Sequence, residues 1–217
     1  MNKIAPFLLA SLIICSCDSG QERWQSKELK KEIASRKLKR VSEADILGLA
    51  SELGNMIATE AQKRLGSQLK KSLQNGGPVE AIRFCNVNAY PLLDSFRNSY
   101  NVEIRRVSLR IRNPNDTPSE MEAQILDAYQ YNIENDIPLD DNLQKIGDTA
   151  ILFSRAIVLN NGMCLKCHGN TENEIQPEVQ EIIQELYKND KATGHSIGEL
   201  RGMWSIIFKK KDLVLSL

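Results

Sequence analysis

The sequence predicts an α+β fold, in which long helices precede and separate several strands. From Ile46 to Leu73, apolar residues recur every three or four positions, which indicates a long amphipathic helix. Alternation of apolar and polar residues within 101–112, and apolar runs at 150–159 and 203–208, indicate strands. Helices and strands do not alternate regularly along the chain, so we do not expect a βαβ array.

The first helix of the predicted domain begins at a capping signal. Ser42 is followed three residues later by Asp45, a spacing that resembles a capping box. This helix should end at Asn75-Gly76-Gly77, and Pro78 suits the first turn of a second helix. In the second helix, Cys85 shares a face with apolar side chains, so we expect it to point at the element on which the helix packs.

Turn and helix-start signals predict the remaining elements. In the strand at 101–112, Val107 is the first of three apolar residues that should share one face. Asn113-Pro114-Asn115-Asp116 then predicts a turn. Thr117-Pro118-Ser119-Glu120 predicts a capping box at the start of a helix that runs to about Asn135. The later elements are expected to be a buried strand, a short helix and a last strand, at 150–159, 177–187 and 203–208.

The first 16 residues have the layout of a secretory signal peptide. One positive charge at Lys3 precedes an apolar run from Ile4 to Ile14, and small residues follow. That run of about 11 residues is too short for a transmembrane helix, which needs roughly 20. Its end, Ile14-Cys15-Ser16-Cys17, resembles a bacterial lipobox and predicts lipidation of Cys17. Simple cleavage to a soluble exported form is the alternative.

The mature chain should consist of a charged tether, residues 17–40, and one domain, residues 41–217. The whole chain carries 28 basic and 28 acidic residues. It therefore lacks the excess of positive charge that is typical of proteins that bind nucleic acid. Hydrophobic residues make up 41% of the chain, enough to bury a core, which excludes a disordered protein. We therefore expect a lipid-anchored domain on the periplasmic face of a bacterial membrane.

Cys164-Leu165-Lys166-Cys167-His168 is the Cys-x-x-Cys-His attachment motif of c-type haem. Thiols at this spacing can reach two vinyl groups of one haem as thioethers, and the adjacent imidazole then lies under the iron. Five cysteines and two histidines in 217 residues give roughly 0.001 chance matches, so haem c is preferred to the alternatives. Those alternatives are a Cys164–Cys167 disulfide, a thioredoxin-like redox pair without its βαβ context, and a zinc site without enough ligands.

The sequence leaves the sixth ligand of the iron open. The mature chain has one other histidine, His195, in a predicted turn, and one other thiol, Cys85, on a predicted helix. An exposed loop imidazole and a small apolar core residue are the ordinary interpretations of these two. However, an unpaired thiol in an oxidising compartment is vulnerable, and coordination to iron would protect it. The positions of Cys85 and His195 in the sequence do not decide which of the two binds the iron.

Several stretches together resemble a family of exported bacterial single-haem proteins, catalogued largely as a domain of unknown function. The matching stretches are 81–86, 105–115 with Glu120, 164–169, 192–195 and 198–205. The resemblance covers about residues 41–208. It implies a PAS-like α+β domain with an antiparallel sheet preceded by helices, and one haem c bound covalently at Cys164 and Cys167.

The resemblance also implies the ligands of the iron. Family members pair the motif histidine with a cysteine from the helix before the strand, and these positions fall on His168 and Cys85. His195 stands where the family more often has Tyr, and this departure leaves a His168/His195 pair as an alternative. Four arginines are candidates to pair with haem propionates, with solvated strand charges as the other interpretation: Arg106, Arg110, Arg112 and Arg201.

Three functions are compatible with a haem c protein of this size. The first is a redox or small-gas sensor that acts through a separate protein partner, because a thiolate opposite an imidazole favours ferric iron and could leave on reduction. The second is a small electron carrier, which the near-neutral charge disfavours slightly. The least favoured is a peroxidase or nitrogen-oxide reductase, for which His195 is the available distal acid or base.

Overall fold

The structure is a computed structural model, which describes residues 27–30, 41–87 and 89–217. The predicted signal peptide at 1–16 and the predicted lipidation site Cys17 lie outside the described residues, as does most of the predicted tether. Residues 27–30 are helical. The unit Val41–Leu217 is an α+β domain, described here by itself. Among the described helices, none combines the length and apolarity needed to cross a bilayer.

The described part of the domain contains six α-helices, a short 3-10 helix and four strands. In chain order they are α2 (Glu43–Val87), α3 (Ala89–Tyr100), β1 (Glu103–Val107), η1 (Pro114–Asp116), α4 (Glu120–Glu134), β2 (Asn142–Ile146), β3 (Ala150–Val158), α5 (Gly162–His168), α6 (Pro177–Leu186), β4 (Leu200–Lys209) and α7 (Lys210–Ser216). The strands form one antiparallel sheet in the order β1-β4-β3-β2. The predicted α+β class and antiparallel sheet are confirmed.

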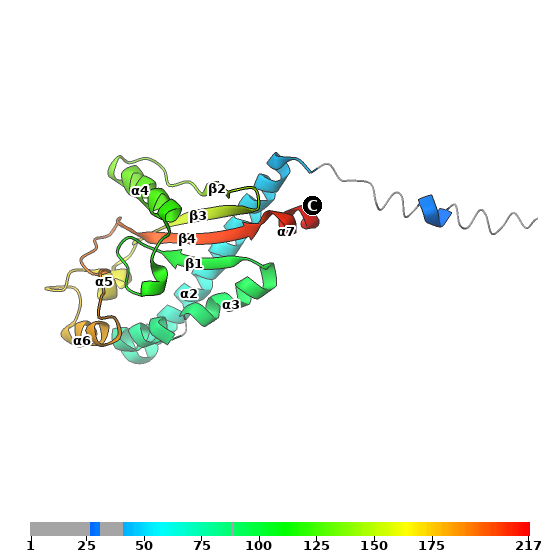
Figure 1. Ribbon diagram of the computed structural model, residues 1–217. Helices are drawn as coiled ribbons and strands as arrows, with labels where there is room; N and C mark the ends of the chain where they lie inside the picture. Colours follow the sequence, from blue (N-terminus) through cyan, green and yellow to red (C-terminus); the bar gives the residue numbers. More distant parts are fainter. Residues whose placement is uncertain (1–26, 31–40, 88) are drawn as a thin grey trace, which may run out of the picture. The chain divides into compact units, whose positions relative to one another are not determined.

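Buried side chains cover both faces of the sheet. Successive residues of a strand point to opposite faces, so Ile151 and Phe153 of β3 pack with α2 and α3, whereas Leu152 packs with α4. A third cluster joins the second half of α2 to α6 through Ile82 and Val179. Figure 1 shows α5 and α6 at the same end of the domain as this half of α2. The third cluster therefore places the Cys-x-x-Cys-His segment beside α2.

A glycine pair interrupts α2 where the sequence predicts the helix end. Gly76 has φ −148°. Gly77 has φ +70°, a backbone conformation that residues with side chains rarely adopt. Pro78 begins the second half of the helix. The predicted capping box is also present, because the Ser42 N–H donates to the Asp45 carboxylate at 2.9 Å and the Asp45 N–H donates to the Ser42 hydroxyl at 3.1 Å.

The strand predicted over 101–112 is too long. β1 ends at Val107, and Leu109 is 46% exposed instead of buried on a sheet face. The chain leaves the sheet because Ser108 bonds elsewhere: its N–H donates to the Asp116 carbonyl at 3.1 Å, and its hydroxyl donates to the Arg201 carbonyl at 2.7 Å. An extended loop can show the same alternation of apolar and polar residues as a strand.

The capping box of α4 lies two residues later than predicted. Ser119, not Thr117, is the cap, and its partner is Glu122. Four elements were not predicted from the sequence: α3, β2, α5 and α7. β2 reads Asn-Leu-Gln-Lys-Ile and is an edge strand, so its polar residues are exposed and give a weak pattern. α3 and α7 follow other elements with almost no turn signal between them.

Glu122 ties the start of α4 to the sheet. Its carboxylate accepts hydrogen bonds from the Ser119 N–H at 2.8 Å, the Ser119 hydroxyl at 2.8 Å and the Ser205 hydroxyl of β4 at 2.6 Å. The guanidinium of Arg105 in β1 also donates to it. Glu122 is only 2% exposed, so one buried carboxylate joins two strands and a helix cap.

Candidate functional site

A cavity lies between the second half of α2, the segment after β1, and α5. Its volume, measured as the space available to the centres of water molecules, is about 190 Å³. On that measure one water needs about 10–15 Å³, so the cavity could hold a group much larger than a few ordered waters. The predicted site residues that line it are Cys85, Arg106, Arg112, Cys164, Cys167, His168 and Arg201. Arg110 and His195 do not line it.

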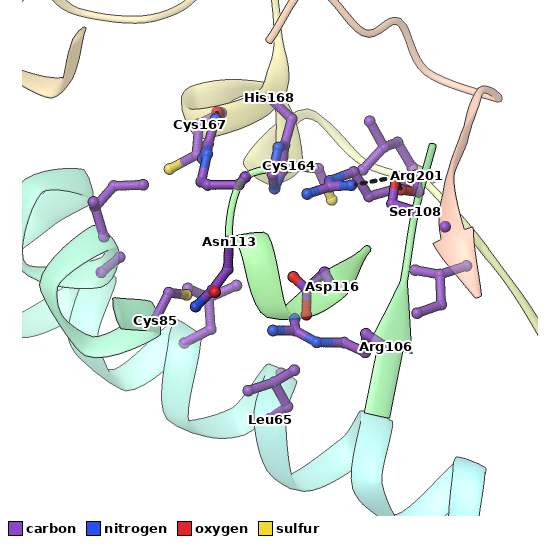
Figure 2. Close-up of a pocket in the computed structure, with 18 of the residues that line it drawn as sticks. Leu65, Cys85, Arg106, Ser108, Asn113, Asp116, Cys164, Cys167, His168 and Arg201 are labelled. Atoms are coloured by element: carbon purple, nitrogen blue, oxygen red, sulfur yellow. Dashed lines mark hydrogen bonds between the residues drawn. The ribbon is translucent and has the colours of Figure 1, made fainter. Parts of the chain in front are cut away.

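The cysteines and the motif histidine approach the cavity from two sides. Figure 2 shows Cys164, Cys167 and His168 of α5 on one side, with Cys85 of α2 on the other. Asn161 caps the start of α5, because its side chain accepts a hydrogen bond from the Met163 N–H at 3.0 Å. Residues three and four apart share a helix face, which is why this one short helix presents the motif side chains together. The three cysteines that line the cavity are free thiols.

The imidazole of His168 is held by the backbone. Its Nδ1 lies 2.8 Å from the Ala192 carbonyl oxygen, which can only accept, so Nδ1 carries the proton and Nε2 does not. Burial, followed by the charges of Arg201 and Arg112, lowers the pKa of His168 well below its ordinary value. The ring is therefore neutral at neutral pH, with a free nitrogen in the form that binds metals.

Two thiols of the cavity, those of Cys85 and Cys167, are protonated in the chain by itself. Burial raises the pKa of Cys85, against the opposing charges of Arg106, Arg112 and Arg201. Burial likewise raises the pKa of Cys167 to about 11. Both groups are thus uncharged at neutral pH, which lowers the cost of holding them in a partly apolar cavity.

Arg201 is a desolvated cation without a carboxylate partner in the described part of the chain. Its guanidinium donates to the Ser108 hydroxyl at 2.9 Å and to the Arg110 carbonyl at 3.1 Å. Burial, followed by the neighbouring charges of Arg112 and Arg106, lowers the pKa of Arg201 to about 9. Removing a cation from water without a counter-ion is costly, so this side chain marks a place for an anionic group.

Arg112 and Arg110 are engaged by the protein itself. The Arg112 Nε lies 2.9 Å from the Asp190 carboxylate, and its Nη2 donates to the Cys167 carbonyl at 2.7 Å. Arg110 donates to the Thr193 carbonyl and lies 3.5 Å from the Glu199 carboxylate. These two arginines therefore hold the segment that follows α6.

His195 is not the exposed loop imidazole that is its ordinary interpretation. It is 2% exposed and packs edge-to-face on His168, with ring centroids 6.2 Å apart. Its Nδ1 lies 3.2 Å from both Arg110 and Glu199. Burial, followed by the charges of Arg110 and Arg201, lowers the pKa of His195 to about 4. The structure thus places His195 against His168 and outside the cavity lining.

The sequence analysis missed two polar residues of the cavity wall. Tyr90 of α3 donates its hydroxyl to the carboxylate of Asp116, and both side chains line the cavity. Burial and this carboxylate raise the pKa of Tyr90 above its ordinary value. Tyr90 was missed because α3 was not predicted. Asp116 was interpreted only as a turn residue, and nothing in its local sequence signals a contact 26 residues away.

Comparison with known proteins identifies a family. The family model for Tll0287-like proteins matches residues 26–208, most of the chain. A crystal structure with a similar fold is that of the cyanobacterial heme-protein Tll0287, with 23% sequence identity and a TM-score of 0.54. The match covers 73% of this chain and 94% of that one. A comparison with curated proteins gave no match. The resemblance that the motifs predict, to a family of single-haem domains, is confirmed.

Proposed function

The chain belongs to the Tll0287-like family, and we propose that it binds one haem c in the cavity between α2 and α5. The observation that carries the proposal is the placement of Cys164, Cys167 and His168 opposite Cys85 (Figure 2). The cyanobacterial protein of similar fold is a heme-protein, which supports the same assignment. We further propose that the sheet and its helices are a variant of the PAS fold.

The residues of the cavity fit this group. Cys164 and Cys167 are free thiols at the spacing that two vinyl groups require. Each thiol would add across one vinyl group: the S–H bond breaks, a C–S bond forms, and the proton goes to the second vinyl carbon. This addition needs no oxidant and has no leaving group. Arg201 offers a desolvated cation for a propionate, and Arg106 lines the same cavity.

We propose His168 and Cys85 as the two protein ligands of the iron. His168 already has the required tautomer, since its Nδ1 proton is bonded to the Ala192 carbonyl. Cys85 lies on the other side of the cavity. His195 packs on His168 outside the cavity lining, which disfavours the His168/His195 pair. When bound, the haem supplies a one-electron redox centre.

A redox or small-gas sensor is the physiological role that we propose. Cys85 belongs to the half of α2 that follows the break at Gly76 and Gly77, and the third buried cluster joins this half to α6. Because this half of α2 is separated from the first half by the glycine break, Cys85 is suited to be a ligand that can leave the iron. An electron carrier would instead need a ligand that stays bound. The proposal includes a separate signalling partner and a periplasmic, lipid-anchored location through Cys17.

Attachment through the two motif cysteines is tested by expression with a haem c maturation system. The wild type is expected to carry haem that resists acid–acetone extraction and adds the mass of one haem. The double variant Cys164→Ser with Cys167→Ser should lose all covalent haem, because no thiol then remains to form a thioether. Cys85→Ser is the control and should keep the added mass. A colourless wild type of unchanged mass would overturn the proposal.

Gas binding separates the candidate roles. Carbon monoxide binds ferrous and not ferric haem, and it is expected to change the optical spectrum of the reduced protein because reduction should release Cys85 and open a coordination position. Reversible redox cycling with no response to carbon monoxide would instead favour the electron carrier. Peroxide turnover that His195→Ala abolishes would favour an enzyme.

A further inference from the structure

Arg112 joins three segments of the chain at the wall of the cavity. It follows β1 and is 7% exposed. Its Nε and Nη2 lie 2.9 and 3.3 Å from the two carboxylate oxygens of Asp190, so the ion pair is two-pronged. Nη2 also donates to the Cys167 carbonyl at 2.7 Å and lies 3.4 Å from the Ala192 carbonyl oxygen. One buried side chain thus binds the end of α5 and the segment at 190–192.

The Ala192 peptide is fixed from both of its sides. The Asp190 carboxylate accepts from the Ala192 N–H at 3.2 Å. The Ala192 carbonyl accepts from Arg112 and, at 2.8 Å, from Nδ1 of His168. Ala192 itself is fully buried. The direction of the carbonyl that holds His168 therefore depends on the Arg112–Asp190 pair.

We propose that Arg112 and Asp190 are positioning residues that set the ring plane and the tautomer of His168. This inference rests on the proposed role of His168 as an iron ligand. It assigns Arg112 a task different from binding a propionate, because Nε and Nη2 already bond to protein acceptors. Arg201 is the contrasting case, since its acceptors are neutral and it has no carboxylate partner among the described residues.

Backbone hydrogen bonds of the loop at 191–195 also hold the imidazole of His168 in place. The His195 N–H donates to the His168 carbonyl at 2.8 Å, so the same loop holds the backbone of His168 as well as its side chain. The Lys191 N–H donates to the Ile111 carbonyl at 2.8 Å, next to Arg112 in the chain. The loop therefore has backbone bonds on both sides of the Arg112–Asp190 pair. In metal sites, groups that orient a ligand in this way affect metal affinity by about 10- to 100-fold.

The test uses Arg112→Lys and Asp190→Asn in the full matured protein. Both variants remove the two-pronged pair, and Asp190→Asn keeps the Arg112 side chain itself. We expect amide hydrogen exchange at residues 191–195 to accelerate by at least about tenfold, the effect of losing one charge-assisted hydrogen bond. The g-values in electron paramagnetic resonance should also shift, because they report the orientation of the ring. Arg155→Lys, which breaks the similar two-pronged pair with Asp141, is the matched control and should leave exchange in this loop unchanged.

Two outcomes would overturn the assignment. If Arg112→Lys moves the reduction potential while exchange at 191–195 and the g-values stay as in the wild type, Arg112 pairs with the cofactor instead. If Asp190→Asn leaves exchange unchanged, the pair does not order the loop. Hydrogen exchange involves only protein atoms, so it also decides the positioning claim in protein that carries no haem. A colourless protein would therefore defeat the proposed function, whereas unaltered exchange would defeat this inference.

Discussion

Replacing Cys85 with alanine should raise the reduction potential of the haem-loaded protein by at least about 0.1 V, within the roughly 0.8 V that axial ligation spans. A thiolate places negative charge on the iron and stabilises the ferric state, so its loss favours reduction. Cys85 is the cysteine that the fold sets opposite α5 across the cavity. Spectroelectrochemical titration measures the potential, and electron paramagnetic resonance of the ferric protein reports the thiolate directly.

His195→Ala is the matched comparison, because His195 is buried next to His168 but does not line the cavity. This variant is expected to keep the ferric thiolate signature, with at most a small change in potential from the altered packing. The opposite pattern would contradict our assignment. If Cys85→Ala kept the wild-type spectrum and His195→Ala lost it, the ligand pair would be His168 and His195.

Glu122→Ala should lower the free energy of unfolding by about 2–4 kcal/mol, because it leaves several buried partners unsatisfied. The hydroxyl of Ser205 and the N–H of Ser119 would lose their acceptor, and Arg105 would lose its counter-ion. Glu120→Gln, two residues earlier in the first turn of α4 and exposed, is the control and should change stability by less than about 0.5 kcal/mol. Urea unfolding of the haem-loaded variants measures both effects. Equal values would show that the Glu122 network adds nothing to stability.

The same carboxylate predicts a dependence of stability on pH. Burial by itself would raise the pKa of Glu122, but the hydrogen bonds from Ser205 and Ser119 and the charge of Arg105 outweigh burial and lower it. The folded-state pKa is therefore below the unfolded one. The stabilisation is complete above the unfolded pKa and is lost as the pH falls through the folded value. Glu122→Gln should remove this part of the acid dependence, and a variant as acid-sensitive as the wild type would contradict the assignment.

Local signals in the sequence predicted local structure well. The break at Gly76 and Gly77 and the capping box at Ser42 depend on a few neighbouring residues, and both are confirmed. The motif at 164–168 was recognised from its spacing, but the short helix that it forms was not predicted. The predicted length of β1 was wrong. The alternation of apolar and polar residues around Leu109 does not reveal where Ser108 finds its hydrogen-bond partners.

Contacts between distant segments could not be predicted. Arg112 and Asp190 are 78 residues apart, and nothing near either one indicates that they pair. His195 is predicted in a turn from its neighbours, yet it is buried beside Arg110 and His168, which come from other segments. Spacing also left Cys85 and His195 as equal candidates, and only the folded chain shows which of them faces the cavity.

β3 and β4 are antiparallel neighbours, but the connection between them is the long excursion at 159–199 that contains α5 and α6. With Cys85 and His168 on one iron, the denatured chain would contain a closed loop from residue 85 to residue 168. By the chain-entropy argument used for disulfides, such a closure disfavours the denatured ensemble by on the order of 4 kcal/mol. The bond from Cys85 to the iron would then act as a cross-link that reduction can release, while the haem stays attached through its thioethers.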